Sequence, residues 1–317
     1  MDSGNIGFVL LCAAFVFVMT PGLAMFYGGL VRKKNVVNTM MTSIFIIGIG
    51  IVMWVLFGYS LSFAPSGNAF IGDFRWLGLE GVSLTEGYTD DASIPNMVFS
   101  AFQMMFAVIT PALITGAVAG RMKFKSIFVF TIFWSLIVYY PLAHMVWGQG
   151  GLLGADGIGA LDFAGGDVVH ISSGVSALVL CILLGKRHDY EHSIYRIHNI
   201  PTVVLGASLL MFGWFGFNAG SALAADGLAA HAFMTTGVSA AAAMLSWMLC
   251  DVVKNKKPTL IGASTGMVAG LVGITPGAGF VPMWAAVIIG LTTSPVCYIM
   301  ISYGKKKFGF DDALDAF

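Results

Sequence analysis

A histidine at the start of an apolar segment is the residue best placed to do chemistry in this sequence. His170 stands in "GGDVVHISSG" (165–174), which leads without a break into "VSALVLCILLG" (175–185). A charged side chain inside a membrane costs roughly 2.5–3.5 kcal/mol on insertion scales, and histidine escapes most of this cost by staying neutral. His170 therefore suits a path that must be polar at one point without being charged.

Two other interpretations of His170 stay open from the residues alone. A structural hydrogen bond across helices is as well supported as a functional role. A metal site is disfavoured, because no HxxE, HxxxH or cysteine partner accompanies His170, and Asp167 could only orient the ring. The cysteines form no CxxC pair and favour packing over a disulfide or a metal site; they are Cys12, Cys181, Cys250 and Cys297.

The remaining histidines are less informative. His188, His192 and His198 are grouped in "KRHDYEHSIYRIHN", a polar loop in which we expect them to be solvated. His231 begins an apolar segment. His144 lies in "PLAHMVWG", where a helix-packing role is favoured over a ligand role.

Aromatic side chains form the second set of candidates. Phe102 and Phe106 lie four residues apart, on one face of a helix. Trp147 stands at a predicted membrane edge, where tryptophan is common as an anchor. The segment "FGWFGFNAGS" (212–221) adds further rings at the end of a predicted span. Each ring alone favours packing or anchoring, but together with His170 they suggest a cation site on ring faces above an apolar route, since cation–π contacts contribute about 0.5–2 kcal/mol each.

The elements that must position these residues are membrane-spanning helices. Of 317 residues, 57% are hydrophobic and 10% charged, with a mean hydropathy of +0.86, whereas a soluble domain has about 25% charged residues. The apolar residues fall in runs of about 20, which are long enough to cross a bilayer. We expect an all-α polytopic membrane protein with a single transmembrane domain over residues 1–317. The expected spans cover about 6–30, 39–64, 96–119, 126–147, 166–185, 200–222, 228–251, 258–280 and 282–303.

Basic residues indicate the orientation of the chain. All sixteen Lys and Arg residues except Arg75 fall in the loops or tail after the first, third, fifth, seventh and ninth spans. Because positive residues collect on the cytoplasmic side, we expect the N terminus outside and the C terminus in the cytoplasm. The net charge of zero, without a basic stripe, gives no sign of a nucleic-acid partner. The longest outer loop, about 65–95, is acidic, which is typical of a solvated loop and would also attract cations.

Glycine and proline suggest how the spans pack. The 40 glycines cluster within spans, which favours close approach of neighbouring helices. Where glycine follows proline, in "TPG" at 20–22 and 275–277, we expect helices to kink or break.

Several segments resemble one family. "DFAGGDVVHISSGVSALVLCILLGKR" (162–187) is similar throughout to the signature segment of ammonium transporters, the Amt/MEP/Rh superfamily. Five other segments resemble further blocks of that family, in the same order: "MTPGLAMFYGGLVRKKN", "AFQMMFAVITPALITGAVAGRMKF", "PLAHMVWGQGG", "GWFGFNAGSA" and "GFDDALDAF". The details fit the Amt/MEP branch better than Rh. The resemblance implies a helix bundle with inverted repeats, in which the first five spans form one half and the last four an incomplete second half.

The resemblance implies roles for residues at the outer end of the bundle. Phe106, Trp147 and Ser221 match the family's outer ammonium-recruitment site. Phe106 and Phe217 match the stacked aromatic gate beneath that site. Asp162 matches an aspartate that shapes the recruitment site.

Further residues match the family's pore. His170 matches the first of two pore histidines, and Trp214 flanks the same lumen. Leu23, Phe26 and Leu210 fall where the family has apolar pore-lining side chains.

The function implied is transmembrane ammonium transport, in which ammonium is recruited outside, deprotonated, and passed as ammonia through an apolar pore. Methylammonium is the convenient analogue. The resemblance further implies a multi-pass protein of the cell membrane, in contact with lipid, that forms a homotrimer, needs no cofactor or metal and is not an enzyme. Many relatives also respond to PII-type regulators through a cytoplasmic tail.

The chain departs from the family in one respect. Family members have eleven spans, and Phe317 falls where the tenth begins, so we expect the second pore histidine, the last helix and the regulatory tail to be lacking. A truncated chain that does not transport is therefore one alternative. An ammonium sensor that signals through a partner is another, although no fused kinase or cyclase domain is present in the sequence. An intramembrane enzyme is the weakest reading, because no nucleophile, base and orienting group share a helix face.

Overall fold

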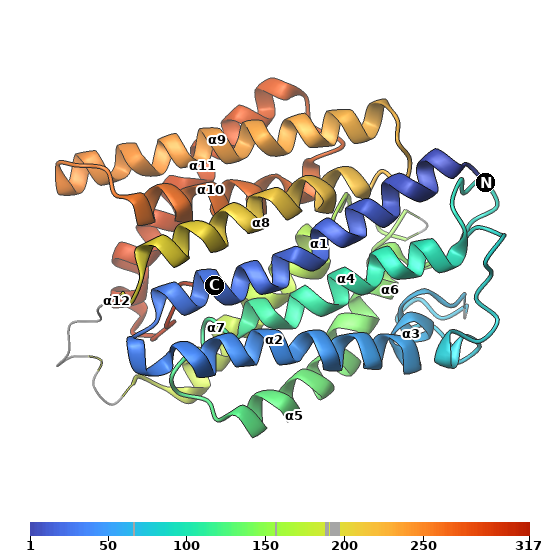
Figure 1. Cartoon of the computed structure of the whole chain (residues 1–317), viewed down its shortest axis with the longest axis horizontal. Coiled ribbons are helices and arrows are strands. Elements are labelled where there is room, and N and C mark those ends of the chain that lie inside the picture. Colours follow the sequence, from blue (N-terminus) through green and yellow to red (C-terminus); the bar gives the residue numbers. More distant parts are fainter. Residues whose placement is uncertain (66, 156, 188–189, 191–196) are drawn as a thin grey trace.

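Every regular element in the described part of the chain is a helix (Figure 1). Nine helical segments among these residues are long and apolar enough to cross a membrane, so the expected all-α polytopic architecture is confirmed. His188, His192 and Arg196 lie outside the described residues. This computed structural model describes residues 1–65, 67–155, 157–187, 190 and 197–317.

The first and third spans are continuous helices, a π turn interrupts the second and the fourth, and the fifth begins with a π turn. The α-helix of the third span ends at Ile114 rather than near 119, and residues 115–121 form turns, the first of them closed by a hydrogen bond from the Thr115 N–H to the carbonyl of Ala112 at 3.2 Å. The elements are α1 (Ser3–Leu30), a short 3₁₀ turn (Lys33–Asn35), α2 (Val36–Met53), a π turn (Trp54–Gly58), α3 (Tyr59–Phe63), a 3₁₀ turn (Leu77–Leu79), α4 (Asn96–Ile114), α5 (Phe124–Trp134), a π turn (Ser135–Tyr139), α6 (Tyr140–Trp147), a π turn (Gly166–Ile171) and α7 (Ser172–Leu184).

The last four spans begin at polar capping residues, except the ninth, which follows Pro282. The side-chain oxygens of Asn199, Asp226 and Thr259 each accept a hydrogen bond from the backbone N–H three residues on, at 3.1, 3.0 and 2.9 Å. Such caps satisfy an N–H that has no partner within the helix. The elements are α8 (Ile200–Gly220), α9 (Gly227–Asn255), α10 (Leu260–Ile274), a 3₁₀ turn (Thr275–Gly277), α11 (Met283–Ile299), a π turn (Met300–Gly304) and α12 (Lys305–Phe308).

The two "TPG" segments behave differently. The segment 275–277 ends α10 and forms a 3₁₀ turn, as a breaking proline predicts. The other lies inside α1, which continues as helix on both sides of Pro21, so the helix does not break there, and the expected kink stays a prediction. Neighbouring helices stabilise a proline-containing membrane helix, and α1 packs along α8 over much of its length.

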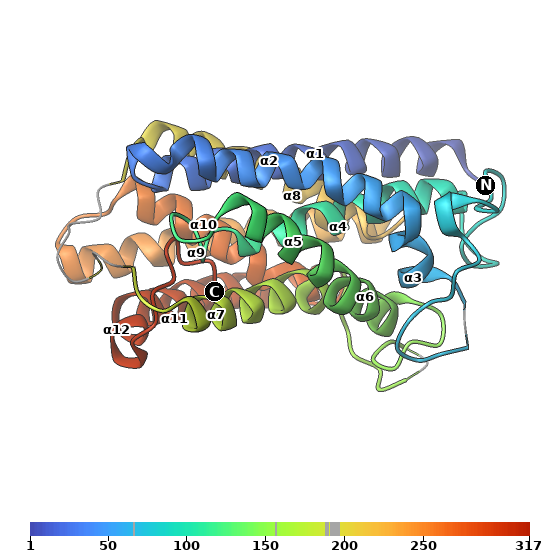
Figure 2. The same cartoon turned by 90° about the horizontal axis from the view of Figure 1, so that it is seen from below.

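Glycines allow α1 and α8 to make the most extensive helix contact in the bundle. A Cβ on Gly29 would lie 2.7 Å from the backbone nitrogen of Val203, and one on Gly216 would lie 2.9 Å from the carbonyl oxygen of Cys12. Only glycine fits such approaches, which the sequence predicted for glycine-rich spans. Figure 2 shows α1 and α2 along one side of the bundle and α6, α7 and α11 along the other.

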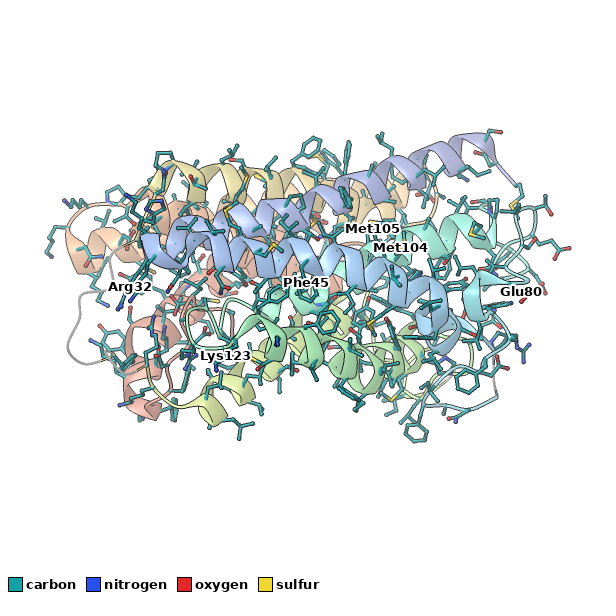
Figure 3. The ribbon with its side chains drawn as sticks, turned by 60° about the horizontal axis from the view of Figure 1, so that its bottom comes forward. Arg32, Phe45, Glu80, Met104, Met105 and Lys123 are labelled. Atoms are coloured by element: carbon teal, nitrogen blue, oxygen red, sulfur yellow. The ribbon has the colours of Figure 1, made fainter. Side chains whose placement is uncertain are left out.

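Charges separate between the two ends of the bundle. Arg32 and Lys123 lie at one end and Glu80 lies at the other (Figure 3). The backbone N–H of Asp2 donates to the carbonyl of Ser93 at 2.8 Å, which places the N terminus beside the acidic loop.

The largest fully buried side chains include three rings that the sequence singled out for function: Phe106, Trp214 and Phe217.

Candidate functional site

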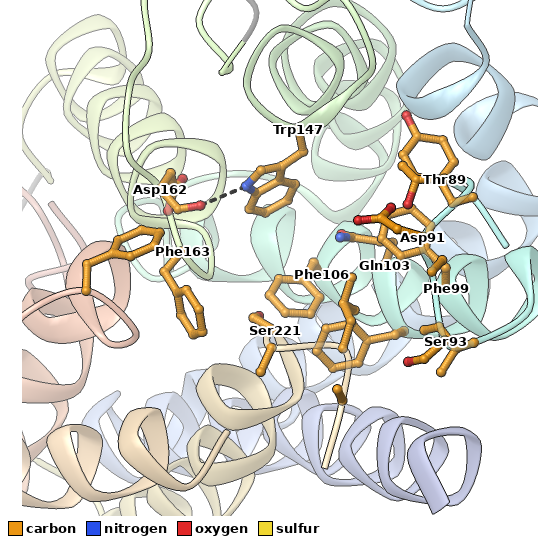
Figure 4. A pocket seen from close by; sticks show the side chains of 18 residues that line it. Thr89, Asp91, Ser93, Phe99, Gln103, Phe106, Trp147, Asp162, Phe163 and Ser221 are labelled. Carbon is orange, nitrogen blue, oxygen red and sulfur yellow. Dashed lines mark hydrogen bonds between the residues drawn. The ribbon is translucent and has the colours of Figure 1, made fainter. Parts of the chain in front are cut away.

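A cavity of about 480 Å³ opens beside the acidic loop, and we call it the vestibule (Figure 4). Its wall contains all three residues predicted for cation recruitment, Phe106, Trp147 and Ser221, together with Asp162. These residues come from α4, from the end of α6, from the end of α8 and from the segment before α7. Other side chains that line the vestibule are Tyr88, Phe99, Phe102, Gln103, Phe163 and Phe280.

The indole of Trp147 is held in a defined orientation. Its Nε1–H donates to the backbone carbonyl of Asp162 at 3.0 Å. The rings of Trp147 and Phe106 meet edge to face, with centroids 6.0 Å apart and an interplanar angle of 86°. Because the indole proton is used in this way, the ring face and not the N–H is what Trp147 offers to a ligand.

The hydroxyl of Ser221 supplies the polar part of the same wall. Its proton is donated to the carbonyl of Phe217, one turn earlier in α8, at 2.9 Å. The oxygen lone pairs stay available to accept a hydrogen bond from a ligand. Ser221 and Trp147 are both only partly buried, so a ligand in the vestibule can reach them.

Asp162 builds the wall and does not act as a free carboxylate. Its Oδ1 accepts from the backbone N–H of Gly165 and Gly166 at 2.7 and 2.6 Å, and its Oδ2 accepts from those of Asp167 and Val168 at 2.8 and 3.2 Å. These are the N–H groups that the first turn of a helix leaves without partners. The carboxylate thereby fixes the turn that carries His170. Gly165 makes this turn possible with φ +118°, which favours glycine.

Beneath the vestibule the aromatic rings form a continuous stack. Phe106 lies 4.3 Å from Phe217, measured between ring centroids. Phe217 lies 6.0 Å from the ring of His170 at an angle of 25°. His170 in turn stacks on Trp214, at 5.3 Å and 19°. Residues predicted as gate, pore histidine and flanking ring from separate segments therefore adjoin one another.

His170 and Trp214 differ in how their polar atoms are satisfied. The Trp214 Nε1–H donates to the hydroxyl of Thr275 at 2.8 Å, and that hydroxyl donates to the carbonyl of Leu271 at 2.7 Å. The Nε2 of His170 is buried and has no hydrogen-bond partner in the described part of the chain. A buried polar atom without a partner calls for an explanation, and a ligand or water molecule that hydrogen-bonds to Nε2 would provide one.

Three predicted pore residues lie elsewhere. Leu23 and Phe26 on α1 and Leu210 on α8 are buried in the apolar core. None of them lines the vestibule. Their part in a path below His170 stays a prediction.

Two other histidines make structural contacts. Both ring nitrogens of His144 face backbone carbonyls, those of Ser62 at 3.1 Å and Asn68 at 2.8 Å. The Nε2 of His231 lies 2.8 Å from the carbonyl of Val281. The packing role expected for His144 agrees with these contacts, while His198 is exposed.

Several wall residues escaped the sequence reasoning. Gln103 is buried, with an Oε1 that has no partner among the described residues, and a polar residue within an apolar span is the signal that could have identified it. Phe163 adjoins Asp162 in sequence, and its ring meets that of Phe280 edge to face at 5.3 Å. Burial raises the pKa of Tyr88 to about 12.

The whole arrangement combines a cavity suited to a small cation with an apolar continuation. Ring faces and hydroxyl lone pairs in the vestibule attract a positive charge. Beyond Phe106 lie the closely packed rings of Phe217 and Trp214 and the ring of His170, and such surroundings disfavour a charged ion.

Comparison with known proteins gives one family. A family model described as Ammonium Transporter Family matches residues 7–317. An ammonium transporter of Bacillus subtilis (strain 168) is 53% identical over 317 residues, which are 100% of this chain and 77% of the relative. An ammonium transporter of Aquifex aeolicus (strain VF5) is 46% identical over 319 residues, covering 100% of this chain and 73% of the relative.

Solved structures give the same result at the level of fold. The structure of Saccharomyces cerevisiae Mep2 is similar with a TM-score of 0.91 at 38% identity, over 100% of this chain and 70% of that one. A structure described as Sensor Amt Protein is similar with a TM-score of 0.88 at 29% identity, over 99% of this chain and 78% of that one.

Proposed function

This chain belongs to the Ammonium Transporter Family, and we propose that its vestibule recruits ammonium, which gives up a proton and continues as ammonia past His170. The observation that carries this proposal is the continuous series from the Trp147 and Phe106 rings through Phe217 to His170. Its relatives are named as transporters, and we propose accordingly that the chain is not an enzyme.

Recruitment rests on matching the charge and the N–H donors of ammonium. The faces of Trp147 and Phe106 attract the cation, at about 0.5–2 kcal/mol for each ring. The oxygen of Ser221 accepts one N–H, because its own proton is engaged with Phe217. These contacts replace part of the hydration shell, while water in the open vestibule retains the rest.

Deprotonation follows from what lies beneath, and the proton that ammonium releases passes to a water molecule in the open vestibule. The Phe106 and Phe217 centroids are 4.3 Å apart, which leaves no room for a hydrated ion unless the rings move. A bare charge in an apolar path costs several kcal/mol, and ammonia avoids that cost. A neutral His170 then offers its unpartnered Nε2 to the passing molecule.

Selectivity against potassium follows from the same chemistry. Potassium matches ammonium in charge but has no proton to lose, so it would have to cross the aromatic gate as an ion. Carbonyl-lined filters select an ion by coordination. Here discrimination would come from deprotonation.

We place the protein in the cell membrane with the vestibule outside. The separation of Arg32 and Lys123 from Glu80 supports this orientation (Figure 3). The homotrimer and the lipid contacts are proposals that rest on the family resemblance, and native mass spectrometry would test the trimer.

The recruitment site is tested by uptake of radiolabelled methylammonium into liposomes containing the protein. We expect Trp147→Leu combined with Ser221→Ala to raise the apparent KM or to weaken discrimination against potassium, because both vestibule contacts are lost. A matched control is Trp284→Leu, since Trp284 is 67% exposed on α11 and away from the vestibule. Unchanged uptake in the double variant would refute the site.

Ammonium sensing is the second candidate. It is favoured by the similarity to the structure described as Sensor Amt Protein. A sensor would bind ammonium in the vestibule without carrying it, so saturable binding with no flux into liposomes would favour sensing over transport.

A further inference from the structure

We propose that the vestibule also binds organic quaternary ammonium ions, such as tetramethylammonium or choline, and that these ions block the path without crossing it. This inference rests on the proposed function, because it assigns a second ligand class to the same cavity. It is carried by the size of the vestibule, by the placement of its rings and by the closed gate beneath it.

The vestibule is much larger than ammonium needs. Its volume is about 480 Å³. Ammonium is close to water in size, and one water takes about 30 Å³ of liquid volume. An ion that touches Trp147, Phe106 and Ser221 therefore leaves most of the cavity to water. A cation with several methyl groups would displace that water and bury apolar surface against the rings.

Aromatic side chains stand on more than one side of the vestibule. Phe106 and Trp147 form its inner part, and Phe163 lies on the opposite side from Phe99 in Figure 4. Ammonium is too small to contact all of these at once. A bulkier cation can contact several ring faces together, which is how proteins recognise quaternary ammonium groups.

The Phe163 wall is firmly placed. Its backbone N–H donates to the carbonyl of Pro276 at 3.0 Å. Its ring packs over Gly279, where even a methyl group would collide with it. Phe280 supports the ring edge to face at 5.3 Å. The second wall is thus formed by residues that the recruitment of ammonium does not require.

Charge at the opening favours cations of any size. Asp91 is exposed and lines the vestibule, and Figure 4 shows its carboxylate beside Gln103. Carboxylates at the mouth of a cleft raise the local concentration of positive ions. A quaternary ion needs no hydrogen-bond acceptor, so the limited number of polar groups in the wall does not penalise it.

Passage of these ions is prevented by chemistry and by space. A quaternary nitrogen has no proton, so it cannot continue as a neutral amine. The rings of Phe106 and Phe217, with centroids 4.3 Å apart, close the way to an ion of this bulk. The bound ion therefore occupies the recruitment site and competes with ammonium.

The test is calorimetric titration of the detergent-solubilised protein with tetramethylammonium, alone and in the presence of ammonium. We expect saturable binding that ammonium displaces competitively. In a Phe163→Leu/Phe280→Leu double variant, tetramethylammonium affinity should fall about five- to thirtyfold, the effect of two lost cation–π contacts at the strength of about 0.5–1 kcal/mol that exposed contacts have, while ammonium affinity stays unchanged. Phe74→Leu is the control, because Phe74 is 68% exposed and does not line the vestibule. If the double variant does not fold, Phe280→Leu alone replaces it.

The contribution of the positive charge is tested with an uncharged ligand of the same shape. Choline should bind more tightly than its uncharged isostere, in which carbon replaces the nitrogen. Equal binding of the two, or affinity unaffected by loss of the Phe163 wall, would overturn the proposal. Ammonium binding without any tetramethylammonium binding would also overturn it while leaving the proposed function intact. Absence of binding by either ion would count against both.

Discussion

Removing the Asp162 carboxylate should destabilise the vestibule strongly. The change Asp162→Ala takes away the acceptors of four backbone N–H groups, which lie 2.6–3.2 Å from the carboxylate oxygens. An unsatisfied buried N–H costs about 1–3 kcal/mol, and partial rehydration reduces the sum. We expect a loss of about 3–5 kcal/mol, and about half of that for Asp162→Asn, whose amide keeps one acceptor oxygen.

Thermal unfolding in detergent, followed by tryptophan fluorescence, measures this loss. In larger domains the unfolding midpoint falls by about 2–4 °C for each kcal/mol of stability lost, so the midpoint for Asp162→Ala should fall by on the order of 10 °C. Asp226→Ala is the matched control, because Asp226 caps α9 through one bond to Ala229 at 3.0 Å and its loss should cost only about 0.5–2 kcal/mol. If Asp162→Ala shifts the midpoint no more than the control, the assignment of Asp162 as the support of this turn is wrong.

Three further predictions concern the aromatic gate, the ion pair in which Asp311 accepts hydrogen bonds from Arg187 at 2.7–2.8 Å, and the orientation of the chain. Phe217→Leu opens the 4.3 Å contact with Phe106 and should admit potassium, measured as ion flux into liposomes; a potassium-tight variant would contradict the gate. Burial raises the pKa of Asp311, but the hydrogen bonds and charge of Arg187 outweigh it and lower the pKa overall. The stability that the ionised Asp311 carboxylate contributes is therefore complete at pH values above about 3.9, the pKa of aspartate in an unfolded chain. It is lost as the pH falls through the lowered pKa that Asp311 has in the folded protein. Asp311→Asn should lower the free energy of unfolding by about 3–5 kcal/mol at pH 7. It should also remove this loss of stability at acid pH, which unfolding measured at a series of pH values would detect. A reporter fused after Lys307 should be active only in its cytoplasmic form; external activity would reverse the orientation.

The sequence predicts the spans well where a long apolar run ends in charge or in a capping residue. Asn199 and Asp226 stand directly before α8 and α9, so the starts of these helices could be read locally. The end of α4 could not. The sequence after Ile114 stays apolar, yet the α-helix gives way there to turns in which backbone N–H groups donate to the carbonyl three residues earlier.

The residues of the candidate site were likewise only partly predictable from the sequence. The resemblance picked out Phe106, Trp147 and Ser221, and the structure gathers them around one cavity. It could not reveal that Phe163 and Gln103 share the wall. In the sequence Phe163 is an ordinary apolar residue and Gln103 an isolated polar one, and only the packing of distant segments brings them to the same cavity. The sequence could not decide between a kink and a break at Pro21 for the same reason, since the packing of the continuous helix α1 against α8 is a tertiary effect.

The loss of a proton by ammonium above a histidine-lined path can be measured by comparing ammonium and potassium flux into liposomes containing the protein or its His170→Ala variant. We expect selective ammonium flux in the unaltered protein. The variant, folded and inserted, should lose the flux or the selectivity, because it lacks Nε2 of His170, a buried atom beside Phe217 that has no hydrogen-bond partner among the described residues. Equal, selective ammonium flux from the two proteins would contradict a role for His170 in the path.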